Sequence, residues 1–317
     1  MDLPLTHKFQ GWDIRYDLKK SPIAGSNPAQ SRSVVFVHGT PWSSIVFKPT
    51  IEALLAKGAY QILAYDLPGY GQSQTYKPSN GASTTKASFP GDTSVKFQAA
   101  ALADLLRHVN LDGKGTNTAP AIIAHDIAGT IVLRAHLLHE CNFDTMLLAD
   151  ANCSLPWGDG FYKLVRSEPQ TFVKLPAKVF EATVRAVIQS ACYDENVLKA
   201  GWENDLARPW VSGDGDGEVG DRQRSFVRQI AQATDGDVAE LLEGNLYAQV
   251  RCDVKIVWGE QDQWIPRARI EETSKGLGSR VKQTAYIPDA GHLVMLDKPE
   301  MFAIEVFDWL IHYGKHC

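Results

Sequence analysis

Short apolar runs recur along the chain and are separated by stretches with a different spacing of apolar positions. The runs predict buried β-strands at residues 34–37, 62–65, 121–124, 146–149, 254–258 and 282–287. Apolar positions three and four residues apart predict helices at residues 45–57, 95–109 and 127–139. This alternation of strands and helices predicts the α/β class, with a mostly parallel sheet covered by helices on both faces.

A long segment interrupts the alternation between the strands at 146–149 and 254–258. Within it, helical periodicity predicts helices at residues 161–165, 172–189 and 223–233, and no convincing strand. We therefore expect a core domain formed by residues 1–152 and 251–317. Residues 153–250 are expected to form an inserted helical cap, or lid, domain.

Two polar segments predict loops. Residues 74–93 are rich in Ser, Thr, Lys, Pro and Gly, which favours a surface loop. The run SGDGDGEVGD at residues 212–221 faintly resembles a calcium loop, but it lacks the further ligand positions and the closing glutamate of an EF-hand. It predicts an acidic turn, and the sequence predicts no metal site.

The composition favours a soluble globular protein. The chain has 317 residues, of which 44% are hydrophobic and 22% charged, and a net charge of −5. The absence of a basic patch argues against nucleic acid as a partner. The first residues form no apolar leader, and no stretch approaches the roughly 18 apolar residues that a membrane span needs. We expect a cytoplasmic protein without membrane contact, and its oligomeric state, including a homodimer, is left open.

An aspartate lies at the tip of a predicted turn where hydrolytic enzymes carry their nucleophile. The sequence PAIIAHDIAGT at residues 120–130 predicts a buried strand, a sharp turn and a helix start, which together form a nucleophile elbow with Asp126 at its tip. A carboxylate is ionised near neutral pH and attacks carbon without first losing a proton. Attack on an ester would give a high-energy anhydride, whereas attack on a saturated carbon with a good leaving group gives an alkyl ester. Asp126 therefore favours epoxides and alkyl halides as substrates.

Two further residues complete a catalytic set. Asp262 follows strand 254–258 in VKIVWGEQDQWIP, and His292 follows strand 282–287 in IPDAGHLV. Open parallel sheets gather their active sites beyond the carboxyl ends of their strands, so we expect both to meet Asp126. Each residue alone is compatible with a helix cap or a turn, but their joint occurrence favours catalysis. His292 would take a proton from water, and Asp262 would orient the imidazole and stabilise its charge.

Backbone groups are predicted to stabilise the negative charge that ester hydrolysis places on a carboxyl oxygen of Asp126. Ile127 follows the nucleophile at a helix N-terminus, and Thr40 lies in HGTPWSS just after strand 34–37. Their N–H groups are the expected oxyanion hole. No step of this scheme needs a cofactor.

Five motifs together resemble the α/β-hydrolase superfamily: HGTPWSS, DLPGYGQS, HDIAG, WGEQDQWIP and DAGH. The order of nucleophile, acid and histidine is also the order in that superfamily. Within it, the aspartate nucleophile and the HGxP loop resemble the branch of epoxide hydrolases and haloalkane dehalogenases. The resemblance implies a parallel sheet with an inserted cap, and hydrolysis through an ester on Asp126.

The chain departs from both halves of that branch. Haloalkane dehalogenases normally carry a tryptophan after the nucleophile and often an asparagine in the loop, where this chain has Ile127 and Thr40. Epoxide hydrolases normally use two cap tyrosines on the leaving oxygen, and Phe226 lies in the stretch where one of them is expected. The candidate substrate-binding residues implied by the resemblance are Trp42, Trp157, Tyr162, Tyr193, Phe226 and Tyr247.

The leading hypothesis is a cofactor-independent hydrolase that opens an epoxide on an apolar small molecule. Hydrolytic dehalogenation of a haloalkane is the first alternative. A lyase or cyclase that uses Asp126 as a base is the second. A receptor that binds a small molecule without turnover is the third, because folds of this type also serve as binding proteins.

Overall fold

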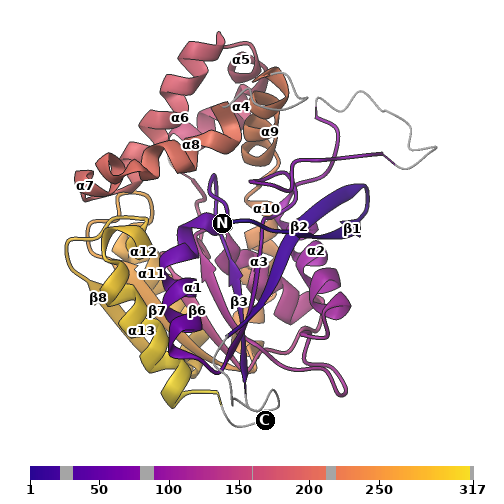
Figure 1. Ribbon diagram of the computed structural model, residues 1–317, viewed down its shortest axis with the longest axis vertical. Coiled ribbons are helices and arrows are strands. Elements are labelled where there is room, and N and C mark those ends of the chain that lie inside the picture. The colour runs from indigo at the N-terminus through magenta and orange to yellow at the C-terminus, as the bar shows by residue number, and fades with distance from the viewer. Residues whose placement is uncertain (22–30, 79–88, 159, 212–218, 315–317) are drawn as a thin grey trace.

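The computed structural model describes residues 1–21, 31–78, 89–158, 160–211 and 219–314. In this described part, eight strands form one sheet in the order β1-β2-β4-β3-β5-β6-β7-β8 (Figure 1). β2 pairs antiparallel with β1 and β4, and all other neighbours are parallel. The strands are β1 (Leu5–Phe9), β2 (Trp12–Lys20), β3 (Arg32–Val37), β4 (Tyr60–Tyr65), β5 (Ala121–His125), β6 (Thr145–Ala149), β7 (Asp253–Gly259) and β8 (Val281–Ile287).

The six strands predicted from apolar runs are confirmed, and the hairpin of β1 and β2 was not predicted. β2 buries alternate residues, beginning with Trp12 and Ile14, while polar side chains take the positions between them. Such alternation belongs to antiparallel strands with one covered face. Continuous apolar runs instead belong to strands buried on both faces, as β3, β4, β5, β6 and β7 are, whereas β8 alternates between half-buried and exposed residues.

Helices cover both faces of the sheet. α1 packs against α13 on one face, while α2 packs against α3 on the other (Figure 1). The helix expected at residues 45–57 begins as the 3-10 turn η2 and becomes α-helical at Lys48. Pro49 lies in the first turn of that α-helix. The helices of the core and its connections are η2 (Ser44–Phe47), α1 (Lys48–Lys57), α2 (Val95–His108), α3 (Ala128–Leu138), α11 (Arg267–Leu277), η5 (Gly278–Arg280), α12 (Val294–Asp297) and α13 (Pro299–His312).

The segment expected to form the cap is helical where the structure describes it. Figure 1 shows α4 to α9 gathered beyond one end of the sheet, whereas α10 lies lower, beside α3. Arg134 of α3 forms an ion pair with Glu240 of α10 at 2.7 Å. The elements are α4 (Gly160–Ser167), α5 (Pro169–Val173), α6 (Ala177–Ala191), α7 (Glu195–Val197), η3 (Leu198–Trp202), α8 (Glu203–Val211), α9 (Val219–Ala231), α10 (Gly236–Glu243) and η4 (Leu246–Gln249).

The single helix predicted over residues 172–189 is wrong. The chain forms α5 and α6 instead, because Pro176 has no N–H to donate and disfavours a helical backbone at Leu175. The break lets α5 and α6 take separate places against α9. The other predicted cap helices correspond to α4 and α9.

The sheet changes its winding direction at β3. The chain passes from β3 to β4 on one side and then, through α2, to β5 on the other. The loops that leave β3 and β5 therefore diverge and open a crevice at the carboxyl ends of these strands. Thr40 and Asp126 lie in those two loops, so the fold itself places them at the position where such sheets bind ligands.

Two sequence predictions fall partly outside the described residues. Residues 79–88 of the expected surface loop and residues 212–218 of the acidic turn are not described. Within the described part of the chain, every helix is too short or too polar to cross a lipid bilayer. The described side chains also contain no group of three His, Cys, Asp or Glu residues placed to hold a metal ion.

Candidate active site

Asp126 occupies a sharp turn between β5 and α3. Its φ of 55° lies in the left-handed region, which aspartate tolerates better than bulky side chains do. Two glycines allow the turn to pack closely: a Cβ at Gly39 would lie 2.5 Å from Asp126 Cβ, and a Cβ at Gly129 would lie 2.5 Å from Cys153 Sγ. The turn holds the Asp126 carboxylate in a fixed position at the end of the central strand, as the nucleophile elbow requires.

Two backbone N–H groups face the Asp126 carboxylate. Thr40 N–H donates to Asp126 Oδ2 over 2.9 Å, and the Ile127 N–H also bonds to this carboxylate and lowers its pKa. The Thr40 hydroxyl pairs with the Tyr70 hydroxyl at 2.6 Å and donates to Gln229 Oε1 at 2.9 Å. The Thr40 N–H is therefore held in place by a core tyrosine and a cap glutamine.

His292 pairs with Asp262 behind the nucleophile. His292 Nδ1 lies 3.0 Å from Asp262 Oδ2, and both side chains are buried. The other oxygen, Asp262 Oδ1, accepts the backbone N–H groups of Trp264 and Ile265 at 2.7 and 3.0 Å. Because both carboxylate oxygens are bonded, Asp262 cannot rotate, and the imidazole is held with Nε2 facing Asp126 Oδ1 at 3.9 Å. This separation is too long for a direct hydrogen bond between the two groups.

The pKa of His292 reflects a competition between burial and neighbouring charge. Burial alone lowers its pKa, but the charges of Asp262 and Asp126 and the hydrogen bond to Asp262 outweigh it and raise the pKa above 6.5. Burial raises the pKa of Asp126 above its ordinary value, opposed by His292 and by the N–H groups of Thr40 and Ile127. The nucleophile is therefore poorly solvated, and a poorly solvated carboxylate attacks carbon more readily than a hydrated one.

Two buried histidines beside this set hold the loops in place. Burial lowers the pKa of His38, and its ring bonds Gly39 O at 2.9 Å and Leu67 N at 3.0 Å. Burial, followed by the nearby His292, lowers the pKa of His125, and its Nε2 donates to His292 O over 2.7 Å. As neutral rings they fix the loops that carry Thr40 and His292.

Two residues near the catalytic set were not predicted from the sequence. The Trp264 ring stacks on His292, with centroids 4.6 Å apart, and Trp264 Nε1 donates to Ser190 Oγ of α6 at 3.1 Å. Asp150 is buried at the end of β6, where burial and then the Asp262 charge raise its pKa well above the ordinary value. Trp264 and Asp150 each follow a strand that was predicted. Their link to the site is visible only in the structure, where Trp264 stacks on His292 and the charge of Asp262 acts on Asp150.

A small cavity of about 50 Å³ lies directly over Asp126. A cavity of this size holds a few water-sized groups. Its lining combines Asp126, Thr40 and Ile127 with residues from the segment 153–250. The lining residues are Thr40, Asp126, Ile127, Asn152, Trp157, Gly158, Tyr162, Arg166, Ile230, Ala233, Trp264 and Ile265.

Two of the six candidate substrate-binding residues, Trp157 and Tyr162, line this cavity. Phe226 instead packs edge-on against Phe180 and Trp210 inside the cap, with both centroid distances 5.4 Å. Its place against α6 and α8 therefore puts it in the packed interior of the cap, away from the cavity.

The remaining three candidates also lie elsewhere. Trp42 is buried behind Trp264, on which it stacks at 5.6 Å. Tyr193 is 51% exposed in the loop after α6. The Tyr247 hydroxyl donates to Cys153 O at 2.6 Å. Each is held away from the cavity by packing or by a hydrogen bond that spacing along the chain does not reveal.

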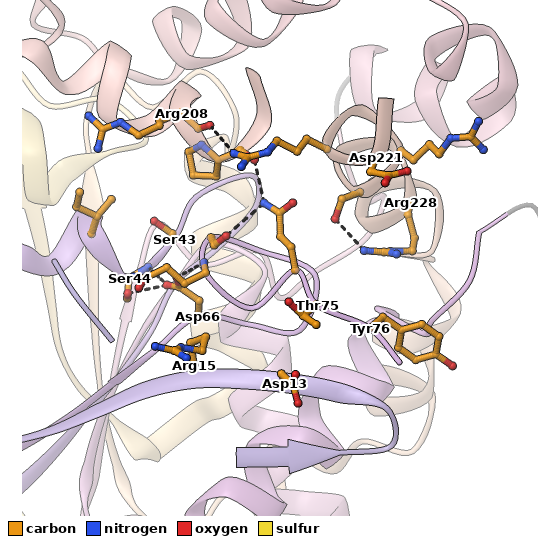
Figure 2. A pocket seen from close by; sticks show the side chains of 18 of the residues that line it. Asp13, Arg15, Ser43, Ser44, Asp66, Thr75, Tyr76, Arg208, Asp221 and Arg228 are labelled. Carbon is orange, nitrogen blue, oxygen red and sulfur yellow. Dashed lines mark hydrogen bonds between the residues drawn. The ribbon is translucent and has the colours of Figure 1, made fainter. Parts of the chain in front are cut away.

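A larger cleft of about 910 Å³ lies elsewhere, between β2 and the cap. Figure 2 shows Arg208 near one end and Arg228 near the other, with Asp13 and Arg15 of β2 below them. None of the three catalytic candidates lines it. Many of its polar groups have partners within the protein: Arg228 lies over the Trp12 ring at 4.7 Å, and Asp66 accepts the Gln72 N–H at 2.7 Å. Its size alone does not make it the catalytic site.

The elbow carboxylate, the paired acid and histidine, and the two facing N–H groups form the arrangement of a hydrolase built at the carboxyl ends of a parallel sheet. The chain belongs to the alpha/beta hydrolase family, whose model matches residues 34–306.

Relatives of known sequence or structure have the same fold. The chain is 22% identical to the uncharacterized hydrolase YugF of Bacillus subtilis (strain 168), over 90% of this chain and 91% of that protein. An alpha/beta hydrolase fold protein from Burkholderia ambifaria is 29% identical with a TM-score of 0.74, covering 97% and 98% of the two chains. The epoxide hydrolase CorEH is 18% identical with a TM-score of 0.71, over 97% and 98%. An esterase from Thermogutta terrifontis is 17% identical with a TM-score of 0.70, over 98% and 97%. Because epoxide hydrolases and esterases share this fold, the fold alone does not define the substrate.

Proposed function

We propose that this hydrolase opens small epoxides through a covalent alkyl ester on Asp126. The observation that supports this most is the set of contacts around that carboxylate. Its Oδ2 accepts the Thr40 N–H at 2.9 Å, which leaves Oδ1 on the side of His292 Nε2. One oxygen is thus stabilised as an oxyanion while the other is available to attack carbon.

In the first step, Asp126 Oδ1 attacks an epoxide carbon and the carbon–oxygen bond of the ring breaks. The ring oxygen takes the bonding pair and a proton from the hydroxyl of Tyr162, a residue of the cavity lining. In the second step, His292 takes a proton from water, and the oxygen of that water adds to the carboxyl carbon of Asp126. Collapse of the adduct releases the diol, protonated by His292, and the remaining proton returns to Tyr162. One oxygen of Asp126 then comes from water.

The tryptophans of the cavity lining do not form the halide site that is normal in haloalkane dehalogenases. Trp157 Nε1 donates to Asn152 O at 3.1 Å, and Trp264 Nε1 donates to Ser190 Oγ at 3.1 Å. Neither tryptophan of the described cavity lining has its indole N–H available to a halide. Ring opening instead produces an alkoxide, which needs a proton, and a phenol such as that of Tyr162 in the cavity lining can supply one.

The covalent step is tested with His292→Gln, in which the ester should form but hydrolyse slowly. After incubation with propylene oxide, we expect a mass increase of one substrate on the peptide that contains Asp126. The double variant Asp126→Asn with His292→Gln is the matched control and should stay unmodified. Diol formation by the native protein without labelling of Asp126 in the His292 variant would refute the ester and favour Asp126 as a base.

A further inference from the structure

An arginine from the cap lies in the wall of the catalytic cavity. Arg166 belongs to α4, and its guanidinium is held by the backbone carbonyl groups of two other residues of the cavity lining. Nη2 donates to Trp157 O over 2.6 Å, and Nη1 donates to Ala233 O over 3.4 Å. A Cβ at Gly158 would lie 3.3 Å from both Nη atoms, so glycine at this position gives the guanidinium room. The positive charge, not only the aliphatic stem, therefore lies at the wall.

This charge is poorly neutralised within the protein. Among the described residues, the one ion pair of Arg166 is with Asp235, 3.8 Å away and with 51% of its side chain exposed. The two hydrogen-bonded partners are neutral carbonyls. A guanidinium has five N–H donors, and the two hydrogen bonds in the structure use two of them. The Arg166 guanidinium therefore has further N–H donors and a positive charge to offer a ligand. It is partly buried, so water screens its charge less than at the surface.

The same cavity lining carries the negative charge of Asp126, and Thr40 and Ile127 already stabilise that carboxylate. The cavity measures about 50 Å³ and is otherwise lined mainly by apolar side chains such as Ile230 and Trp264. An apolar substrate would cover the remaining N–H donors of Arg166 without bonding them, which is unfavourable. A substrate with an anionic end directed to Arg166 and an electrophilic carbon directed to Asp126 satisfies both groups.

We infer that the substrate carries a carboxylate, bound by Arg166, within one or two bonds of the carbon that Asp126 attacks. A planar carboxylate matches the fork of a guanidinium. A cavity that holds only a few water-sized groups leaves room for a short epoxy acid and little more. This inference rests on the proposed function for the reaction, but it changes the expected substrate from an apolar molecule to a small organic anion.

The test compares glycidate, a short epoxy acid, with glycidamide, its neutral counterpart of nearly equal shape. A hydrogen bond to a charged group contributes about 1.5–3 kcal/mol, so the native protein should prefer glycidate in kcat/KM by on the order of 10- to 100-fold. Arg166→Gln keeps amide donors but loses the charge, and should remove this preference mainly through KM. Arg166→Lys keeps the charge and should restore part of it. Lys163→Met removes an exposed charge from the same helix and should leave the preference unchanged.

Equal loss of activity on both substrates in Arg166→Gln, or a native preference for glycidamide, would overturn the inference. A binding measurement separates it from the proposed reaction. Propanoate should bind the native protein at least about tenfold more tightly than propanamide in a calorimetric titration, and Arg166→Gln should equalise them. Equal binding by the native protein contradicts the carboxylate site, whatever the chemistry. Tight propanoate binding without any ester on Asp126 would instead contradict the proposed reaction and retain the site.

Discussion

The pair of Asp262 and His292 offers the sharpest quantitative prediction. Asp262→Asn keeps the Oδ1 acceptor for the N–H groups of Trp264 and Ile265, so the loop should remain in place. It removes the negative charge that lies 3.0 Å from His292 Nδ1. An imidazolium forms only when His292 takes a proton from water, so the loss falls on hydrolysis of the ester and not on its formation.

The size of the effect follows from the distance. Two unit charges about 4 Å apart interact by about 4 kcal/mol at an effective dielectric constant of about 20. Each 1.36 kcal/mol changes a rate about tenfold, so ester hydrolysis should slow by about 1000-fold. The rate of ester formation should change by less than about threefold, since no charge develops on His292 in that step. The ester on Asp126 should therefore accumulate in each turnover.

Rapid quenching after mixing with excess epoxide, followed by quantification of the alkylated Asp126 peptide, gives both rates in one experiment. Asp289→Asn is a suitable control, because Asp289 is an exposed carboxylate in the same loop as His292, and asparagine also tolerates its positive φ of 52°. If ester formation and ester hydrolysis slowed in parallel in Asp262→Asn, the assignment of the charge to the second step would be refuted.

Three further predictions follow. In the free protein, the charges of Asp262 and Asp126 outweigh burial and raise the pKa of His292 above 6.5. Because His292 must lose its proton before it can act as a base, the rate of ester decay should rise with pH, and a single-turnover profile that is flat in pH would contradict this. Burial raises the pKa of Asp126 above 3.8, so the folded state loses stability as pH rises and this group ionises. Asp126→Asn should abolish turnover yet melt at a higher temperature than the native protein at neutral pH and at nearly the same temperature in acid, and calorimetry that showed no such divergence would count against it. Gly39→Ala would place a Cβ 2.7 Å from Asp126 Oδ2, so ester formation should fall by about 100-fold with the fold retained, as measured by rapid quenching and circular dichroism.

The sheet and the catalytic set were accessible from the sequence for one physical reason. Strands buried on both faces are written as apolar runs, and the residues that follow them meet at one edge of the sheet. Asp126 and Asp262 follow such runs, His292 follows the alternating strand β8, and the structure brings the three residues together. The antiparallel strand β2 instead alternates buried apolar residues with more exposed polar ones, so it forms no apolar run. Pro176 divides the helix that was expected over residues 172–189.

The cap was harder to predict because its helices are placed by contacts between segments distant in the sequence. Tyr162 and Tyr193 are equivalent candidates by residue type, but only Tyr162 lines the cavity. Arg166 stands in an ordinary amphipathic helix, and its importance arises from the carbonyl groups of Trp157 and Ala233, the second of which is 67 residues away. No spacing rule connects these positions.

The stack of Trp264 on His292 links the cap to the timing of catalysis. Since Ser190 of α6 holds the indole, the support behind the imidazole depends on where that helix rests. A bulky molecule that displaces α6 would still be able to alkylate Asp126. Without the Ser190 contact, however, Trp264 would no longer support the His292 ring during hydrolysis of the ester. Oversized compounds would then be excluded by slow hydrolysis of their ester, which inactivates the enzyme, and not by failure to enter the cavity.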